Sequence, residues 1–153
     1  SIRRVYHAAY GFLGDRETAR EAAQEAMMKA YAARARYDTS QPFYPWMYRI
    51  VKNTCLDILA RRRRRPRAAL DVERFTDSRP SPLDAAQLSQ QHARLWAAME
   101  TLSEPHREII NLRHFQDLTY SEIADVLGVA EGTVMSRLFR ARSALARAMR
   151  EER

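Results

Sequence analysis

Residues 119–150 read TYSEIADVLGVAEGTVMSRLFRARSALARAMR, a pattern typical of two helices joined by a tight turn. Thr119 and Glu122 match the T-x-x-E capping box, which satisfies free backbone amides at a helix start. Apolar residues then recur at helical spacing, and Gly128 is the residue type that most readily adopts the left-handed conformation of a helix stop. A second helix is expected from about Glu131. This pattern predicts a helix-turn-helix, whose second helix can enter a DNA major groove.

The predicted second helix presents two chemically different faces. Residues 131–150 carry five arginines against one glutamate, net +4, whereas residues 88–130 carry three arginines against six acids, net −3. Positive charge is therefore concentrated where DNA phosphates need it, although a helical hairpin with a solvated basic face is the alternative. Phe139 lies on the polar face, where an aromatic side chain has no core to fill. The expected DNA contacts of this helix are Thr133, Met135, Ser136, Arg137, Phe139, Arg140 and Arg142.

Composition limits the class of protein. The 153 residues are enough for one domain or two small ones, and 46% hydrophobic with 29% charged residues is typical of a soluble globular chain. No signal peptide is visible, and no apolar run approaches the roughly 20 residues that a membrane helix needs. The single cysteine, Cys55, excludes an internal disulfide and fits a reducing cytoplasm. The net charge of +7 favours a polyanionic partner.

The first part of the chain predicts three helices. Apolar residues repeat at helical spacing over residues 2–13, and Ser1 already lies inside this pattern, so we expect the natural N-terminus further upstream. Asp15 is the expected N-cap of a second helix, whose alanines allow close approach by a neighbouring helix. A turn-rich loop at residues 38–42 leads into a third helix, which ends in five arginines at residues 61–65.

Charge and proline content divide the chain into three segments. Residues 1–65 hold fourteen basic and six acidic residues, net +8; residues 66–87 hold three and four, net −1; residues 88–153 hold nine of each. Three prolines mark the middle segment as a linker with at most short local helix. Glycine is scarce and β-rich runs are few. We therefore predict an all-α protein of two small helical domains joined by a flexible linker.

The third predicted helix has aromatic residues at its start and arginines at its end. Aromatic faces can stack unpaired bases, and a basic groove can hold the strand beside them. Two plainer interpretations stay open. The aromatic residues Phe43, Tyr44 and Trp46 can be core residues, and for Trp46 and Tyr48 core packing is favoured. Arginines at the end of a helix are stabilised by its dipole and can simply be solvated.

The sequence contains no catalytic constellation. Its four histidines, His7, His92, His106 and His114, are scattered without metal-ligand spacing. No glycine-rich phosphate loop occurs, and the carboxylates are expected on solvated helix faces. We therefore expect neither an enzyme, nor a metal site, nor a cofactor.

Three stretches taken in order carry a family resemblance. They are GDRETAREAAQEAMMKAY at 14–31, FYPWMYRIVKNTCLDILARRRRR at 43–65 and LSEPHREIINLRHFQDLTYSEIADVLGVAEGTVMSRLFRARSAL at 102–145. The W-x-Y-R-I-x-x-N and G-T-V-x-S-R-L-x-R-A-R patterns are specific when they occur together. Over nearly its whole length the chain resembles the extracytoplasmic-function (ECF) sigma factors of bacterial RNA polymerase.

The resemblance implies an alternative sigma factor, which binds core RNA polymerase and directs promoter-specific transcription initiation without bond chemistry of its own. The first stretch implies docking on the polymerase clamp helices through Glu21, Gln24, Glu25, Met27 and Met28. The second implies recognition and melting of the minus-ten element, with a flipped base received at residues 39–41. The residues implied there are Tyr37, Thr39, Ser40, Gln41, Phe43, Tyr44, Trp46, Arg49, Lys52, Asn53, Arg61 and Arg62, with Tyr48 beside them.

The third stretch implies that residues 88–153 read the minus-thirty-five element. By this resemblance Met135, Ser136, Phe139 and Arg140 face base edges, and Arg137 and Arg142 lie nearer phosphates. The implied partners are core RNA polymerase (clamp helices and flap), promoter DNA in double-stranded and melted form, and an anti-sigma factor. The implied location is the cytoplasm, at the nucleoid, without membrane insertion. A helix-turn-helix repressor or response-regulator output domain is the alternative, but it explains residues 119–150 only.

Overall fold

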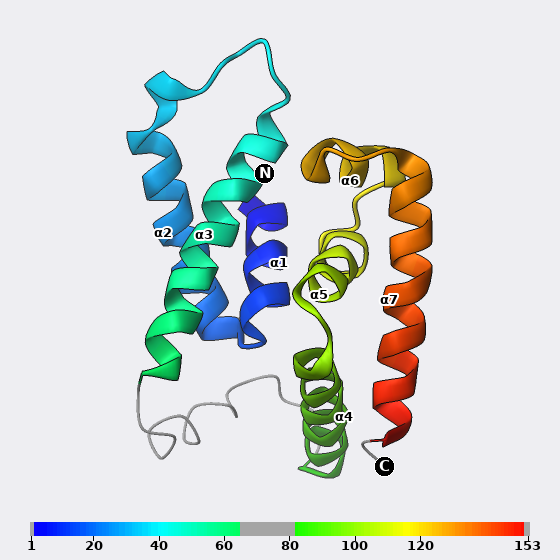
Figure 1. Ribbon diagram of the computed structural model, residues 1–153. Coiled ribbons are helices and arrows are strands. Elements are labelled where there is room, and N and C mark those ends of the chain that lie inside the picture. Colours follow the sequence, from blue (N-terminus) through cyan, green and yellow to red (C-terminus); the bar gives the residue numbers. More distant parts are fainter. Residues whose placement is uncertain (1, 65–81, 152–153) are drawn as a thin grey trace.

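The computed structural model describes residues 2–64 and 82–151 (Figure 1). Every regular element in these ranges is helical, which confirms the predicted all-α class for that part of the chain. Residues 2–64 form the first module, with helices α1 (Ile2–Leu13), α2 (Arg16–Ala32), the 3₁₀ turn η1 (Arg34–Arg36) and α3 (Phe43–Arg63). Residues 82–151 form the second module, with α4 (Pro82–Thr101), α5 (Glu104–Ile110), the π-helical turn η3 (Asn111–Phe115), α6 (Tyr120–Leu127) and α7 (Glu131–Glu151).

The first module packs its three α-helices around an alanine-rich face of α2. Its small side chains let α1 and α3 approach closely, and Val5 and Val51 fill the core between them. The carboxylate of Asp15 accepts a hydrogen bond from the Thr18 amide at 2.9 Å, so the predicted N-cap of α2 is confirmed. The buried alanines are Ala19, Ala22, Ala23, Ala26 and Ala30.

The second module contains the predicted helix-turn-helix. The Thr119 amide donates to the Glu122 carboxylate at 3.0 Å, and the Glu122 amide donates to the Thr119 hydroxyl at 3.1 Å, so both halves of the capping box are present. Gly128 ends α6 at φ 67° and ψ 38°, in the left-handed region. Helix α7 then packs through Val134 and Leu138, both buried.

Helix α4 begins earlier than the sequence pattern indicates. It starts at Pro82, so its first turns include residues 82–87, which we expected in the linker. Proline is tolerated at the first position of a helix because its missing N–H has no intrahelical partner there. The rest of the predicted linker, residues 66–81, lies outside the described residues.

The two modules lie side by side, with α1 against η3 and α3 against α6 (Figure 1). The side-chain amide of Asn111 donates to the backbone carbonyl of Ala8 at 3.2 Å across this contact. The imidazole Nδ1 of His7 donates to the carbonyl of Phe115 at 3.0 Å. We expected two modules connected by a linker, and the structure adds a direct contact between them.

Loss of the Thr119 hydroxyl should destabilise the second module. We expect Thr119→Ala to reduce the free energy of unfolding by about 1 kcal/mol, because the Glu122 amide loses its acceptor. Chemical denaturation followed by circular dichroism measures this difference. Thr119→Ser keeps the hydroxyl and is the matched control, so equal stability of the alanine and serine variants would contradict the role of the cap.

Candidate nucleic-acid interface

Helix α7 presents an exposed row of side chains opposite its buried stripe. Met135 and Phe139 are 56% and 72% exposed although both are large and apolar. Ser136 and Arg140 are also exposed, and with Phe139 they share one face because residues three and four apart are neighbours on a helix. The Ser136 hydroxyl donates to the carbonyl of the half-buried Thr133 at 3.1 Å. The fold does not use this row for packing, so it is available to a partner.

Arg142 lies on a different side of α7. Its Nε donates to Nε2 of His114 at 3.1 Å. The pKa of His114 is lowered by partial burial, and the positive charges of Arg142 and Arg113 lower it further. The neutral imidazole therefore serves as the acceptor that holds Arg142 against the module. Arg137 is half-buried, whereas Arg140 is exposed, so the arginines of α7 differ in surroundings as well as in direction.

The loop before α3 is held in a defined turn by hydrogen bonds of its own residues. Asp38 Oδ1 accepts from the Ser40 amide at 2.9 Å and from the Ser40 hydroxyl at 2.7 Å. The hydroxyl and then the amide lower the pKa of Asp38, which keeps its carboxylate charged. The Tyr37 hydroxyl donates to the carbonyl of Gln41 at 2.6 Å. These bonds hold the loop in shape while Thr39, Ser40 and Gln41 are exposed.

Three aromatic rings pack together next to this loop. Tyr37 lies 5.5 Å from Phe43 and 5.0 Å from Trp46 between ring centroids, and Phe43 lies 5.7 Å from Trp46. Phe43 is 48% exposed, so the cluster presents a ring to solvent. Trp46 also packs against the core of the first module, as the core interpretation favoured. The exposed ring and the ordered loop together form a surface on which an unstacked base can rest.

The predicted DNA contacts of α3 fall on two different faces. The side chains exposed to solvent are Phe43, Arg49, Asn53 and Arg61. The side chains turned toward the second module are Tyr44, Tyr48 and Lys52. The structure therefore does not bring all of these residues to one free surface.

Polar groups of the second module hold the covered face of α3. The Tyr48 hydroxyl donates to Glu108 Oε2 at 2.7 Å, and Lys52 Nζ lies 2.7 Å from the same oxygen. Burial raises the pKa of Tyr48 far above its ordinary value, and the Glu108 carboxylate adds to the shift. The Tyr44 hydroxyl donates to Gln116 Oε1, and burial likewise raises the pKa of Tyr44. Both tyrosines therefore stay protonated and act as donors.

One arginine of the run at the end of α3 has a structural role. Arg62 Nη1 donates to the carbonyl of Leu13 at 3.4 Å, and its Nη2 lies 4.0 Å from Asp15 Oδ2. Arg62 therefore joins the end of α3 to the end of α1. Arg61 is exposed and has room to contact a phosphate.

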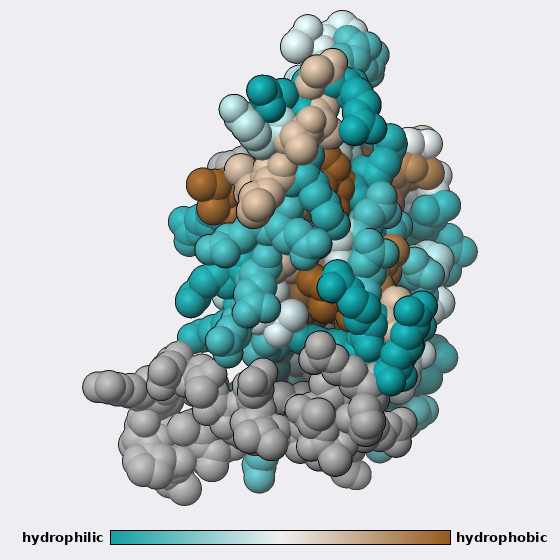
Figure 2. Space-filling view, turned by 90° about the vertical axis from the view of Figure 1, so that its left-hand side faces the viewer, coloured by the Kyte–Doolittle hydropathy of each residue, from teal (hydrophilic) through white to brown (hydrophobic). Residues whose placement is uncertain are grey.

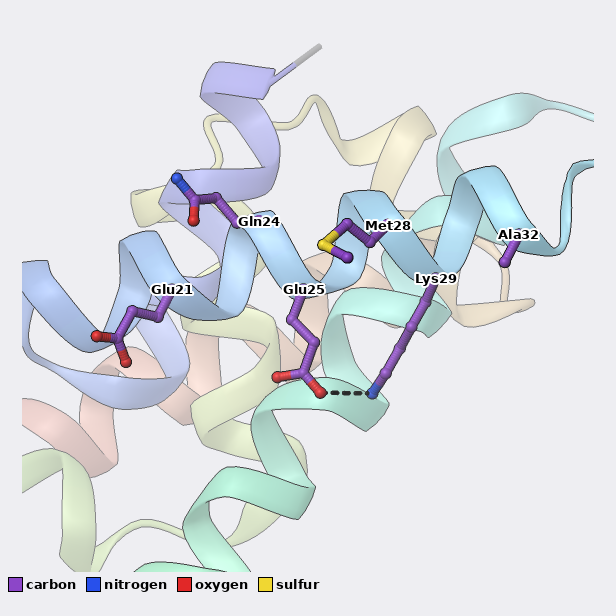
Figure 3. Close-up of a pocket in the computed structure, with 6 residues that line it drawn as sticks. All are labelled: Glu21, Gln24, Glu25, Met28, Lys29 and Ala32. Atoms are coloured by element: carbon purple, nitrogen blue, oxygen red, sulfur yellow. Dashed lines mark ion pairs between the residues drawn. The ribbon is translucent and has the colours of Figure 1, made fainter.

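The predicted docking residues lie along the outer side of α2. Figure 2 shows that the side of the molecule on which α2 lies is largely hydrophilic, with small hydrophobic patches. Glu21 and Gln24 are exposed, Met27 is 38% exposed and Met28 is 73% exposed, whereas Glu25 is half-buried. An open hollow of about 410 Å³ follows this side of the helix (Figure 3). Its lining residues are Glu21, Gln24, Glu25, Met28, Lys29 and Ala32.

Two residues of this α2 surface are missing from the predicted set. Lys29 pairs with Glu25 at 3.2 Å, and their i, i+4 spacing is a signal that could have found it. Tyr31 is 68% exposed, three residues after Met28, with the Arg34 guanidinium 3.9 Å above its ring. The surface is therefore more aromatic than the predicted residues indicate.

Two other kinds of site have no candidate among residues 2–64 and 82–151. No three side chains of histidine, cysteine, aspartate or glutamate are grouped there so as to hold a metal ion. None of the helices described combines the length and the apolar character that a membrane crossing requires.

Comparison with protein families matches both modules. The family described as "Sigma-70 region 2" matches residues 1–65, and the family described as "Sigma-70, region 4" matches residues 92–145. The RNA polymerase sigma-H factor of Pseudomonas aeruginosa is 37% identical over 147 residues, which cover 90% of this chain and 76% of that protein. The ECF RNA polymerase sigma-E factor of Escherichia coli is 36% identical over 133 residues, which cover 80% of this chain and 69% of that protein.

Two solved structures share the fold. The sigma factor RpoE of Bartonella quintana, solved in complex with the anti-sigma factor NepR, matches with a TM-score of 0.61 at 23% identity, over 99% of this chain and 93% of that chain. CnrH, solved in complex with the cytosolic domain of CnrY, matches with a TM-score of 0.64 at 23% identity, over 98% of this chain and 82% of that chain.

The His114–Arg142 contact should make stability depend on pH. Because the folded state lowers the pKa of His114 below its ordinary value of 6.5, the unfolded chain takes up the proton first as the pH falls. Between pH 7.5 and 5.5 we therefore expect the free energy of unfolding to decrease more for the wild type than for His114→Gln. Urea denaturation at both pH values measures this, and an identical pH dependence in the two proteins would refute it.

Proposed function

Because the chain belongs to the ECF group of the sigma-70 family and directs transcription initiation by RNA polymerase, we propose that its two modules divide the reading of a promoter. Residues 1–65 bind core polymerase and open the minus-ten element, residues 66–87 connect the modules, and residues 88–153 read the minus-thirty-five element. The proposal is supported chiefly by the two family matches, which occur in one chain and in this order. The family is not an enzyme family, so the bond chemistry is that of the polymerase.

The outer side of α2 is the proposed docking face for core polymerase. It combines charged and amide groups with two exposed methionines, and flexible thioethers adapt well to a partner surface. The buried alanine stripe on the opposite side of α2 fixes the helix to the module, so the docking face is held on a rigid element. The proposed contacts are Glu21, Gln24, Glu25, Met27 and Met28.

The loop at residues 39–41 and the ring cluster of Tyr37, Phe43 and Trp46 are the proposed site for melted DNA. Extruding a base costs a few kcal/mol of stacking and pairing, which a pocket with an aromatic platform can offset. The turn held by Asp38 is ordered before DNA arrives, so less ordering free energy is lost on binding. The exposed Arg49, Asn53 and Arg61 extend this site along α3.

Helix α7 is the proposed recognition helix. Its exposed row of Met135, Ser136, Phe139 and Arg140 faces the base edges, and Thr133 lies at the start of this row. Arginine in the major groove pairs with guanine O6 and N7, whereas Arg137 and Arg142 are assigned to phosphates. The apolar side chains of the row suit contact with thymine methyl groups.

We also propose an anti-sigma partner for this chain. The fold relative RpoE was solved with the anti-sigma factor NepR. Here the exposed apolar side chains of Met28 and Phe139 give such a partner an attachment point on each module. In this proposal the chain acts at the nucleoid in the cytoplasm. Co-purification from its host followed by mass spectrometry tests the partner, and recovery of core polymerase alone would argue against it.

Run-off transcription with core polymerase on a random promoter library tests the proposed function. We expect the chain and core together to enrich templates that share two spaced elements, which core alone does not enrich. The alternative, a helix-turn-helix repressor or response-regulator output domain, needs no polymerase. DNA binding without core, accompanied by no enriched transcripts, would favour that alternative.

Shortening the polar side chains of the docking face should weaken polymerase binding. We expect Gln24→Ala combined with Glu25→Ala to reduce capture of core polymerase at least about tenfold, a loss of roughly 1.4 kcal/mol, while helicity is unchanged. Pull-down of core over a range of concentrations measures this. The control, Gln90→Ala with Glu100→Ala, removes the same groups from exposed positions on α4 and should bind normally. Equal capture by both double variants would rule out this docking face.

Substitution of two arginines of α7 should have different effects, because one is assigned to base edges and the other to a phosphate. Arg140→Ala should abolish the preference for the correct minus-thirty-five element over a scrambled one, a loss of about 1–3 kcal/mol of discrimination. Arg142→Ala should weaken binding to the correct and to the scrambled element about equally, and should lower the slope of DNA affinity against salt concentration by roughly one. The reason is that Arg142 lies about 200° round the helix from Arg140, on the side assigned to phosphates. Competition binding by the reconstituted holoenzyme at two salt concentrations measures both effects. If Arg140→Ala keeps full preference and only its salt slope changes, Arg140 is a phosphate contact.

A further inference from the structure

Three basic side chains of the second module gather beside helix α7. Arg142 Nε donates to Nε2 of His114 at 3.1 Å, and both of these side chains are exposed. Arg113 precedes His114 in the turn η3. Partial burial lowers the pKa of His114, and the charges of the two arginines lower it further. The proposed function assigns a phosphate to Arg142 and gives no role to the imidazole beside it.

Arg142 lies at the edge of the exposed row of α7. It follows Phe139 by three residues, so the two side chains are neighbours on the helix surface. When a helix lies in the major groove, the middle of its inner face reaches the base edges, and residues at the edge of that face meet the phosphates of the groove wall. The pair of Arg142 and His114 is therefore placed where a DNA phosphate is expected.

The hydrogen bond to Arg142 fixes the tautomer of the neutral imidazole. Because a guanidinium only donates, Nε2 of His114 is the acceptor and the ring proton is on Nδ1. A second proton on Nε2 would face the Nε–H of Arg142, and the two donors would have no acceptor between them. A DNA phosphate supplies that acceptor together with a negative charge, and its oxygens can accept from both groups.

Other charged groups on η3 and on the elements packed against it bond elsewhere. These pairs are His7 of α1 with the Phe115 carbonyl, Glu108 of α5 with Lys52, Glu122 of α6 with Arg4, and Asp117 with Arg113. The two side chains whose charges act on His114 are both arginines. An anion that binds at this cluster would therefore reverse the electrostatic effect that keeps the imidazole neutral.

We propose that His114 is a further phosphate contact of the second module, and that it takes up a proton from solvent when a DNA phosphate binds beside Arg142. The inference rests on the proposed function, because it takes α7 to be the helix that lies in the major groove. In the free chain the neutral imidazole accepts from Arg142. In the complex the imidazolium and the guanidinium both donate to the phosphate. The proton and the DNA therefore strengthen each other's binding by the same factor.

Promoter affinity should then increase as the pH falls. The pKa of His114 lies below 6.5 in the free chain, and the negative phosphate raises it in the complex. At a pH between these two values the complex holds more protons than the free chain, so a lower pH favours the complex. Because a phosphate contact carries no sequence information, the increase should be equal for the correct and for a scrambled minus-thirty-five element.

The test compares DNA binding by the reconstituted holoenzyme at pH 8.0 and pH 6.0, with duplexes taken from the selected promoters. His114→Gln keeps an acceptor for Arg142 but cannot gain a charge. His114→Lys carries a positive charge at both pH values. The matched control is His106→Gln, the same chemical change at a half-buried position of α5.

The wild type should gain affinity at the lower pH, and His114→Gln should not share this gain. Coupling between two bound groups commonly changes affinity by roughly 5–150-fold, and we expect about fivefold for this exposed pair. His106→Gln should follow the wild type, and His114→Lys should bind tightly at both pH values. The slope of DNA affinity against salt concentration should steepen by up to about one at pH 6.0 in the wild type only, which a purely structural role of His114 would not cause.

The same pH dependence of affinity in the wild type and in His114→Gln overturns the proposal. A second measurement separates it from the proposed function and needs no substitution. Nitrogen NMR of the full chain with labelled histidine reports the protonation of His114, first alone and then with a short duplex of random sequence at low salt. We expect the duplex to raise the pKa of His114.

The two proposals fail in different ways. If the duplex raises the pKa of His114 but wild-type chain and core give no promoter-dependent transcription, the proposed function is refuted and the phosphate contact stands. If transcription from selected promoters is found but the duplex leaves the pKa of His114 unchanged, the phosphate contact alone is refuted. The NMR result also decides the matter if either variant of His114 loses helicity by circular dichroism.

Discussion

The arrangement of the two modules depends on the hydrogen bonds of the Asn111 side-chain amide. It joins a backbone carbonyl of α1 to the side-chain amide of Gln116 in the second module, and both amide side chains are buried. A buried amide that loses a partner costs about 1–3 kcal/mol, so this hydrogen-bond chain resists small shifts of one module against the other. The π-helical turn that presents Asn111 and Gly11, the glycine of α1 that admits it, both serve this approach.

Helix α3 connects that constraint to function. Its exposed side carries Arg49 and Asn53 and leads to the ring cluster beside the loop, and its covered side carries Tyr44 and Lys52 against the second module. The helix therefore cannot present all its proposed promoter contacts while the two modules are in contact. Helix α2, by contrast, presents its outer side freely. The proposed docking face on α2 is thus exposed in the same structure in which part of α3 is covered.

Local features of the fold could be predicted because their signals are local. The capping box of Thr119 and Glu122, the stop at Gly128 and the alanine stripe of α2 each lie within a few residues, and all are confirmed. The contact between the modules could not be predicted, because Asn111 and its partner Ala8 are 103 residues apart and helical periodicity shows which face is buried but not what buries it. For the same reason the sequence could not separate Lys52, which is paired with Glu108, from the exposed Arg49.

The most direct measurement is the distance between the modules in the free chain and in the promoter complex. Dyes on Arg20→Cys in α2 and Arg147→Cys in α7, both at exposed positions, report it by energy transfer. The natural Cys55 is buried, and burial raises the pKa of its thiol to about 12, so it does not compete for the label. We expect high transfer in the free chain and a clear decrease in the holoenzyme on a promoter. Equal transfer in the two states would contradict a sigma factor that opens to read DNA.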